Sequence, residues 1–420
     1  MRRNLVAGSY GLWLFATEVL FYFYYTGSDS SDQVTLEISV LLGLIPAAVQ
    51  LLLLGFNPLG AVASVRWALT FLLIVLASFL ASVFWSGNEY TAGLVWVASL
   101  VFIFFISILV AGSPDERLIR SIAVFYSVPA ALFLLYVTAT GEYVWGRLQA
   151  HGITADWWGF MGAGLAMAAL AHRSRWLTAL CIGAGFCVAY AASARSGMVA
   201  ILAGLLAVGF LELRLLRGSR LVTVLAISLA GLVLLTLFSS TVTDAVTKAI
   251  VQTMLLNDPG RGLDSGLTGR TEIWGQAIQI WLSSPVLGVG FHQSSTLISG
   301  NYSAHNVYLA ALADTGILGL AWYLAFLCAS LLASLSINER HTRNAAVGTI
   351  VGYIVMGFFD ARGLNSGNPF SLYFEMCAFF ALRHASLQRL VLDAPEPSLE
   401  KPITLGWASV LKGRLGLAAK

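Results

Sequence analysis

The chain is dominated by a succession of apolar runs, each about 20 residues long and separated by shorter polar segments. A helix of this length crosses the hydrocarbon core of a bilayer, because about 1.5 Å of rise per residue spans a layer about 30 Å thick. We count about twelve such runs, centred near residues 15, 45, 73, 101, 128, 165, 184, 204, 230, 320, 352 and 379. The sequence therefore predicts an all-α polytopic membrane protein with about twelve transmembrane helices.

The composition favours a membrane location over a soluble one. Hydrophobic residues make up 58% of the chain and charged residues only 11%, whereas a soluble domain has roughly 25% charged residues. The net charge of +3 is too small and too scattered to attract nucleic acid. We therefore expect contact with membrane lipids and no nucleic-acid partner. The first apolar run lacks a following small-residue cleavage site, so we expect it to be retained as a helix.

The distribution of basic residues predicts the orientation, because Lys and Arg stay mostly on the cytoplasmic side of a membrane. With a cytoplasmic N-terminus, all but six of the 24 Lys and Arg residues fall on the cytoplasmic side. This placement also predicts a cytoplasmic C-terminus. The six exceptions, which would face outward, are Arg147, Arg195, Lys248, Arg261, Arg270 and Arg362.

These patterns divide the chain into four segments. We expect about nine transmembrane helices over 1–239, an outer loop over 240–304, about three more transmembrane helices over 305–389 and a tail over 390–420. The loop contains GRTEIWGQAIQIWL, in which aromatic and aliphatic residues recur at helical spacing on one side. Such a helix is expected to lie in the membrane interface, with its Trp rings at headgroup depth.

Five of the outward cations are arginines, and they come from separate outer segments. A guanidinium group can bind phosphate oxygens through two parallel hydrogen bonds, which a lysine ammonium cannot do. We therefore expect a shared anionic ligand, and a diphosphate with a lipid tail would lie at this depth. The substrate-binding arginines would be Arg147, Arg195, Arg261, Arg270 and Arg362.

Local explanations for these arginines stay open at this point. Arg195 could be an interfacial anchor whose long side chain reaches the headgroups. Arg362 could pair with Asp360, and Arg147 with Glu142 in its own loop. The Gly-rich segment NDPGRGLDSG could simply leave its arginine in solvent.

His305 stands at the outer edge of an apolar run, next to Asn306 and close to Tyr308. Nearby guanidinium groups disfavour a cationic imidazole, so we expect His305 to be neutral at pH 7. A neutral imidazole can accept a proton, as a general base must. We therefore predict His305 as a catalytic residue and the two neighbouring polar side chains as substrate-binding groups.

Metal and cofactor motifs are missing from the sequence. It contains no His, Cys or Glu spacing typical of zinc, no Walker A loop, no GxSxG and no outer acidic pair for a divalent metal. A catalyst built from these residues would neutralise phosphate charge with arginines. We therefore predict a metal-independent protein without a cofactor.

An ordered set of motifs resembles the O-antigen ligase family, within a larger group of bacterial inner-membrane glycosyltransferases. The motifs are SARSG at 193–197, GRTEIW at 269–274, PVLGVG at 285–290, HNVYLAALADTGILGL at 305–320 and DARG at 360–363. They cover the C-terminal half of the chain, and the plan of apolar runs is similar over the whole length.

This resemblance implies a function and a mechanism. Family members transfer a glycan from undecaprenyl diphosphate to a sugar hydroxyl of the lipid A-core, on the periplasmic face of the inner membrane. The resemblance implies a GT-C type fold and metal-independent transfer with inversion at the anomeric carbon. Carried over by motif, the essential residues are Arg195, Arg270 and His305.

Four other functions stay open. O-antigen polymerases and protein O-oligosaccharyltransferases share much of the motif pattern and the same donor. A transporter of a polyprenyl-linked glycan would place its charges near the bilayer midplane, in repeated halves. A non-catalytic scaffold would tolerate alanine at the three motif residues.

Overall fold

The computed structural model describes residues 1–24, 38–39, 41–85, 91–113, 115, 117–144, 147–148, 155–214, 270–299, 303–360 and 368–392. These residues form helices and one two-stranded antiparallel sheet. The elements are α1 Arg2–Tyr24, α3 Leu44–Leu53, α4 Pro58–Trp85, α5 Thr91–Ala111, α6 Leu118–Thr140, β1 Tyr143–Val144, β2 Arg147–Leu148, α7 Ala155–Ala168, η2 Ala169–Ala171, α8 Arg175–Ala191, α9 Arg195–Arg214, α12 Arg270–Ser283, α13 Ser294–Leu297, α14 Val307–Leu335, α15 Arg340–Gly357 and α16 Pro369–Leu392.

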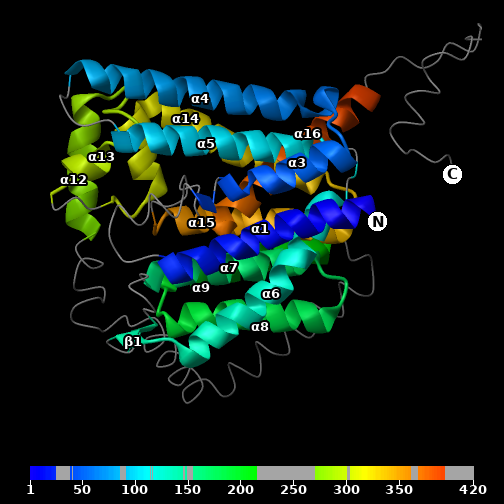
Figure 1. The fold of residues 1–420 in the computed structure, drawn as a ribbon. Helices are drawn as coiled ribbons and strands as arrows, with labels where there is room; N and C mark the ends of the chain where they lie inside the picture. The colour runs from blue at the N-terminus through cyan, green and yellow to red at the C-terminus, as the bar shows by residue number, and fades with distance from the viewer. Residues whose placement is uncertain are drawn as a thin grey trace, which may run out of the picture.

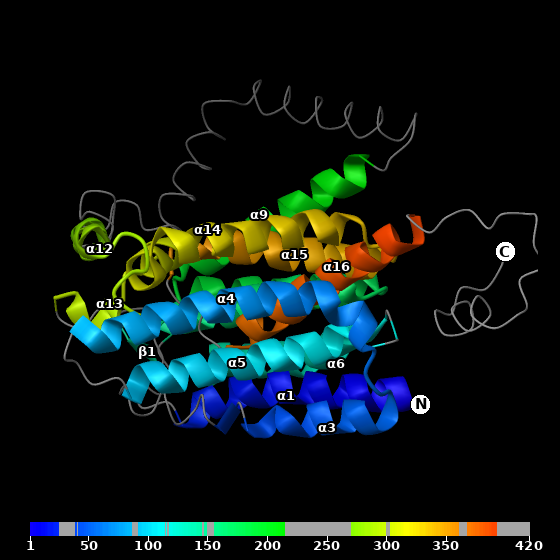
Figure 2. The ribbon, with the colours of Figure 1, turned by 90° about the horizontal axis from the view of Figure 1, so that it is seen from above.

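The long helices run side by side along one direction, while α12 lies crosswise at one end of the bundle (Figures 1 and 2). The N-terminus is at the opposite end. We call these ends the α12 end and the N-terminal end. A helix that crosses the end of a bundle is suited to lie in the membrane interface.

Four of the described helices are long and apolar enough to cross a membrane: Ala61–Val83, Leu118–Thr140, Arg195–Leu213 and Val307–Leu335. Shorter apolar helices occupy Leu44–Leu53, Trp96–Ala111 and Arg175–Ala191. The chain is therefore an all-α membrane protein, as predicted. Of the expected centres, only the one near residue 230 falls outside the described residues. The number of twelve spans stays a prediction.

Helix α16, which corresponds to the apolar run centred near residue 379, lies in the interior of the bundle. Its residues from Phe370 to His384 are almost all buried by protein. A helix that contacts protein on all sides can carry polar groups that lipid would exclude. The polar residues on α16 include Ser371, Glu375 and Arg383, each at most 4% exposed.

Helix α7 lies in the interior, and its glycines allow close approach of three neighbouring helices. A Cβ atom on Gly159 would collide with Ala194, at the entry to α9, while one on Gly162 would collide with the carbonyl of Gly185 on α8. A Cβ on Gly164 would lie 2.9 Å from the Cβ of Phe370 on α16. Small residues at helix contacts let backbones pack closely, as is common in membrane proteins.

Candidate functional site

The most unusual element is α14, whose backbone is broken at Gly316 (φ 65°, ψ −168°). The rings of Tyr308 and Tyr323 have centroids 6.2 Å apart, although residues this far apart in a straight helix would differ by about 22 Å in height. The break therefore turns the first half of the helix back toward the second. Residues 307–315 form a half-helix whose N-terminus follows His305.

The loop with the sequence PVLGVG, at 285–290, fills the break. A break in a helix leaves backbone N–H and C=O groups without partners, and these groups must be satisfied inside a membrane. Four backbone hydrogen bonds join the loop to the broken helix: Ile317 N–H to Pro285 O (2.9 Å), Leu318 N–H to Val286 O (3.5 Å), Val289 N–H to Ala313 O (2.9 Å) and Gly290 N–H to Asp314 O (3.0 Å). The loop therefore replaces the missing helical bonds.

Two glycines make this contact possible. Gly288 and Gly316 both have positive φ, at 74° and 65°. A Cβ on Gly288 would collide with the backbone of Asp314, and a Cβ on Gly316 would collide with the backbone of Val286. Only glycine tolerates this combination of left-handed backbone and close approach. Glycine is therefore needed at position 288 of PVLGVG and at position 316 of DTG.

The carboxylate of Asp314 fixes the continuation of this loop. It accepts hydrogen bonds from the backbone N–H of His292 (2.9 Å) and of Ser294 (2.8 Å). The imidazole of His292 stacks on Trp96 of α5, with ring centroids 4.5 Å apart and an interplanar angle of 7°. The half-helix is therefore held to the rest of the bundle through loop 285–294.

His305 lies at the corner between this half-helix and the preceding segment. It has a left-handed backbone (φ 47°), and its N–H donates to the hydroxyl of Ser303 at 3.3 Å. The residue is half-buried. A left-handed non-glycine residue is uncommon and is maintained by its surroundings, so the corner is a specific local structure.

Asn306 and Tyr308 connect this corner to α15. The Asn306 side chain caps α14, accepting from the N–H of Tyr308 (3.0 Å) and of Leu309 (3.1 Å), and its amide donates to Phe358 O at 3.3 Å. The Tyr308 hydroxyl donates to Ile354 O at 2.6 Å. Both polar groups thus have partners within the protein. Their predicted role in binding substrate stays a prediction.

Helix α12 places Arg270 on the side that contacts this corner. The indole N–H of Trp274 donates to Ala304 O at 3.0 Å, one residue before His305. Ala277 of α12 packs with Ile298 and Ala304 in a small apolar cluster. Residues four apart in a helix share a face. The half-buried Arg270 is therefore directed to the same region as Trp274.

The way α9 packs against α15 places Arg195 close to the end of α15, where Phe358 binds Asn306. A Cβ on Gly352 would lie 3.2 Å from Ala200 O, and one on Gly204 would lie 2.8 Å from Gly348 O. These pairs define an antiparallel register in which Arg195 lies opposite the end of α15. The carbonyl of Phe358, which binds Asn306, follows that end directly.

Arg147 also belongs to this end of the molecule. It lies in β2, and its Nε donates to Ala192 O at 3.1 Å, just before Arg195. The intervening Ser193 has a left-handed backbone (φ 50°). The structure therefore joins the loop of Arg147 to the first turn of α9. The remaining predicted arginines, Arg261 and Arg362, lie outside the described residues.

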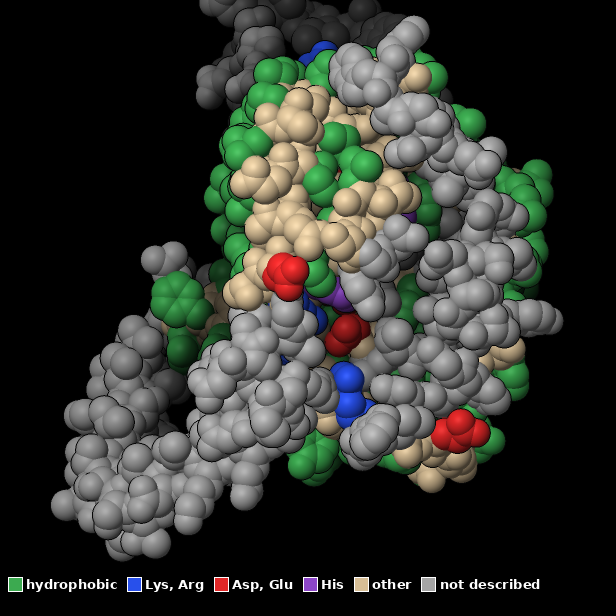
Figure 3. Space-filling view, turned by 90° about the vertical axis from the view of Figure 1, so that its left-hand side faces the viewer, with side chains coloured by type: hydrophobic (Ala, Val, Ile, Leu, Met, Phe, Trp, Pro, Cys, Tyr) green, Lys and Arg blue, Asp and Glu red, His purple; other side chains and the backbone are tan. Residues whose placement is uncertain are grey.

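Figure 3 looks onto the α12 end and shows a hollow in which basic, histidine and acidic side chains gather. The Lys and Arg residues described at this end are Arg147, Arg195 and Arg270. Among the residues that the structure describes, no three His, Cys, Asp or Glu side chains are grouped as metal ligands. The groups brought together here can bind an anion and accept a proton.

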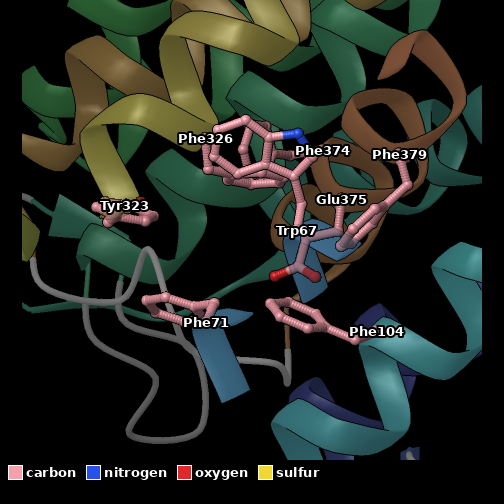
Figure 4. Close-up of a pocket in the computed structure, with 8 residues that line it drawn as sticks. All are labelled: Trp67, Phe71, Phe104, Tyr323, Phe326, Phe374, Glu375 and Phe379. Atoms are coloured by element: carbon pink, nitrogen blue, oxygen red, sulfur yellow. The ribbon is translucent and has the colours of Figure 1, made fainter. Parts of the chain in front are cut away.

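A second cavity lies inside the bundle, between α4, α5, α14 and α16 (Figure 4). The carboxylate of Glu375 points into it, and the other lining residues are aromatic: Trp67, Phe71, Phe104, Tyr323, Phe326, Phe374 and Phe379. Its volume of about 10 Å³ is enough for a single water molecule. This cavity is too small for a sugar or a diphosphate, so it is not the substrate site.

Comparison with known proteins finds that residues 177–324 match the O-antigen ligase family. The match covers less than half of the chain. The match confirms the resemblance based on the motifs and supports an enzyme that transfers glycans, of the ligase or polymerase type. No curated protein sequence matches the chain significantly.

The O-antigen ligase region contains most of the elements described above. It extends from α8 into the second half of α14, and it includes Arg195, Arg270, the loop 285–290 and His305. The helix break at Gly316 also lies within it. Arg147 and α15 lie outside the region matched, yet they contact it through the hydrogen bonds to Ala192 and from Asn306.

Two acidic residues of this end were not predicted as site residues. Asp360 is only 2% exposed and follows Phe358, whose carbonyl binds Asn306. Asp156 lies in the first turn of α7, close to the contact between Gly159 and the start of α9. Asp360 could have been noticed from the sequence, because it is part of the DARG motif. Asp156 could not, because its place near the start of α9 follows from the packing of Gly159, which only the structure reveals.

Proposed function

We propose that the protein is an O-antigen ligase, which transfers a glycan from undecaprenyl diphosphate to a sugar hydroxyl of the lipid A-core. The observation that supports this proposal is the O-antigen ligase match over residues 177–324, a segment that includes Arg195, Arg270 and His305. Cationic groups beside a proton acceptor are what an arginine-dependent glycosyl transfer needs. We place the reaction on the periplasmic face of the bacterial inner membrane, with both termini cytoplasmic, following the charge distribution.

In this mechanism Arg195 and Arg270 bind the donor diphosphate, with Arg147 assisting. Arg261 and Arg362 are further candidates for the same role. The diphosphate gains negative charge as the bond between its oxygen and the anomeric carbon breaks. Arginines fixed before reaction stabilise this charge more in the transition state than in the ground state. They therefore accelerate the departure of the leaving group without a metal ion.

His305 acts as the general base in this mechanism. Its imidazole takes the proton from the acceptor hydroxyl, whose oxygen attacks the anomeric carbon from the side opposite the leaving diphosphate. One carbon–oxygen bond forms as the other breaks, and because the attack comes from the side opposite the leaving group, the configuration at that carbon inverts. Asn306 and Tyr308 hold the corner and are proposed to contact the acceptor when it is bound.

The lipid tail of the donor also needs an apolar path from the site. A shallow, open groove lies at Ser283–Leu287, beside the break in α14. The neighbouring Leu282, Val286 and Ile317 are all about half exposed. We propose that the first isoprene units lie along this groove, because their burial there removes apolar surface from the headgroup region.

The proposal is tested with purified protein in nanodiscs, supplied with a lipid-linked glycan of defined anomeric configuration. Product is separated by mass with and without added lipid A-core. We expect a glycosylated lipid A-core of inverted configuration, formed only when the acceptor is present. Extension of the donor glycan without the acceptor would show a polymerase instead. Movement of intact donor between leaflets, without any new glycosidic bond, would show a transporter.

A further inference from the structure

A cluster of arginines lies at the N-terminal end, away from the proposed active site. Arg117 and Arg120 lie at the start of α6, and Arg173 and Arg175 lie before and at the start of α8. Arg120 has electrostatic interactions with Arg117 and Arg173, so the two helix ends form one positively charged surface. We call these four residues the arginine cluster.

The arginine cluster is open to its surroundings. Arg117, Arg173 and Arg175 are exposed, while Arg120 is half-buried and its Nε donates to Ala171 O at 3.0 Å. That bond fixes the start of α6 to the segment that leads into α8. The other three guanidinium groups are therefore presented on a surface whose backbone is held in place.

Two described acidic residues lie near the cluster, and one of them, Glu339, interacts electrostatically with Arg120. Asp115 accepts from the backbone N–H of Arg117 at 2.9 Å and lies 3.5 Å from the Arg3 guanidinium. Glu339 accepts from the N–H and the hydroxyl of Thr342, at 2.7 and 2.6 Å. Glu116 lies outside the described residues. The two described carboxylates therefore neutralise only half of the four positive charges.

The surface next to the cluster is suited to lipid chains. An exposed apolar stripe follows Arg117 along α6, and a second follows Arg175 along α8. The residues and their exposed fractions are Phe125 43%, Val128 36%, Leu132 63%, Leu177 38% and Leu180 52%. Trp176, at the level of the arginines, is 86% exposed. Trp rings favour the headgroup region of a bilayer.

We propose that the arginine cluster binds the headgroup of an anionic glycerophospholipid, whose acyl chains lie on the apolar stripes of α6 and α8. The phosphate provides the negative charge that the cluster lacks, and guanidinium forks fit its oxygens. Continuous apolar surface beneath the charge distinguishes a lipid from a soluble anion or an acidic peptide. Basic pockets between helices at one membrane face are known binding places for such lipids.

The test measures lipid binding to the full-length protein by native mass spectrometry. Phosphatidylglycerol and cardiolipin are compared with phosphatidylethanolamine at equal concentration. We expect the wild type to prefer the two anionic lipids. The double variant Arg117→Ala/Arg173→Ala should lose on the order of tenfold in affinity for them, because each basic residue near an anionic headgroup contributes a several-fold factor. The Lys variants at both positions should retain part of the preference.

The matched control is Arg66→Ala/Arg389→Ala, which removes the same charge from exposed positions outside the cluster. This control should keep the lipid preference of the wild type, and all variants should keep the wild-type Tm within a few degrees. Equal loss in the control would contradict the proposal, as would equal binding of all three lipids. Displacement of the lipid by inorganic phosphate alone, or tighter binding of a polyglutamate peptide, would also overturn it.

Discussion

At the scale of single residues, the corner at His305 depends on side chains that do not themselves react. Asn306 uses both ends of its amide, because its oxygen caps α14 and its nitrogen binds the carbonyl of Phe358 on the neighbouring segment. A cap and a tertiary contact in one side chain fix the position of the preceding residue. Asn306 thus helps to hold the corner at which His305 lies.

We predict that Asn306→Ala lowers stability by about 1 to 2 kcal/mol, because the helix loses its cap and Phe358 loses a donor. Asn306→Asp keeps the capping oxygen and removes only the donor, so it should lose less. The Tm of both variants, measured by scanning fluorimetry, checks this order. Equal Tm values for alanine and aspartate would show that the cap is unimportant.

A second residue-scale prediction concerns Glu339, the N-cap of α15. Burial acts to raise the pKa of its carboxyl, but hydrogen bonds from Thr342 and the nearby positive charge of Arg120 outweigh burial and lower the pKa below its ordinary value. A carboxyl with a lowered pKa in the folded state stabilises fully above its unfolded pKa of about 4.3. This stabilisation is lost as the pH falls through the folded pKa.

Wild type should therefore exceed Glu339→Gln in Tm at neutral pH, and the difference should shrink as the buffer is acidified below pH about 4. Thermal unfolding of both proteins across this range measures it. A Tm difference that stays constant with pH would mean that the charge of Glu339 does not contribute.

At the scale of elements, the half-helix of residues 307–315 and loop 285–294 behave as one structural unit. The loop supplies the backbone hydrogen bonds that the break at Gly316 removes, and Asp314 holds the following segment. Neither part satisfies its backbone groups alone. The orientation of the half-helix, and so of His305, depends on this pairing.

We predict that Gly316→Ala separates the loop from the helix, because the new Cβ meets the Val286 backbone and the positive φ is strained. Tm should fall by several degrees, and glycan transfer should fall further than the Tm alone explains. The control is Gly275→Ala on α12, where a Cβ meets nothing within 4 Å. Normal transfer by Gly316→Ala would argue against the pairing as the basis of the site.

The packing of α7 gives a similar test away from the site. Gly162→Ala places a Cβ against the backbone of Gly185, which cannot yield as a side chain can. We expect a loss of about 1 to 3 kcal/mol from overpacking. Gly183→Ala on α8 has open space around the new Cβ, so it should be neutral or slightly stabilising. Similar Tm values for both variants would contradict the close contact.

At the scale of the whole molecule, the two ends of the bundle carry different charged groups. The α12 end gathers Arg195, Arg270 and His305, whereas the N-terminal end carries the arginine cluster and the larger share of the basic residues predicted to face the cytoplasm. Between them, the aromatic cavity at Glu375 has room only for a water molecule. This arrangement suits a reaction at one membrane surface better than passage through the protein.

Much of this arrangement could be predicted from the sequence. Apolar run length located the helices, and the motif order identified the family over residues 177–324. Hydropathy could not reveal the break in α14, because the run from Val307 to Leu335 stays apolar on average despite Asp314 and Thr315 just before Gly316. The role of that glycine is visible only with its partner loop, which lies more than 25 residues earlier. The position of Arg195 beside the end of α15 likewise depends on how α9 packs against α15, which the sequence near Arg195 does not show.

We propose that His305, with Arg195 and Arg270, forms the catalytic centre. The decisive measurement is the single-turnover rate of glycan transfer from a lipid-linked donor to lipid A-core by purified His305→Ala. We predict a loss of at least about a hundredfold, the effect expected for a general base, at unchanged Tm. His341→Ala, a half-buried histidine at the other end, should keep the wild-type rate. Transfer by His305→Ala at the wild-type rate would contradict the account.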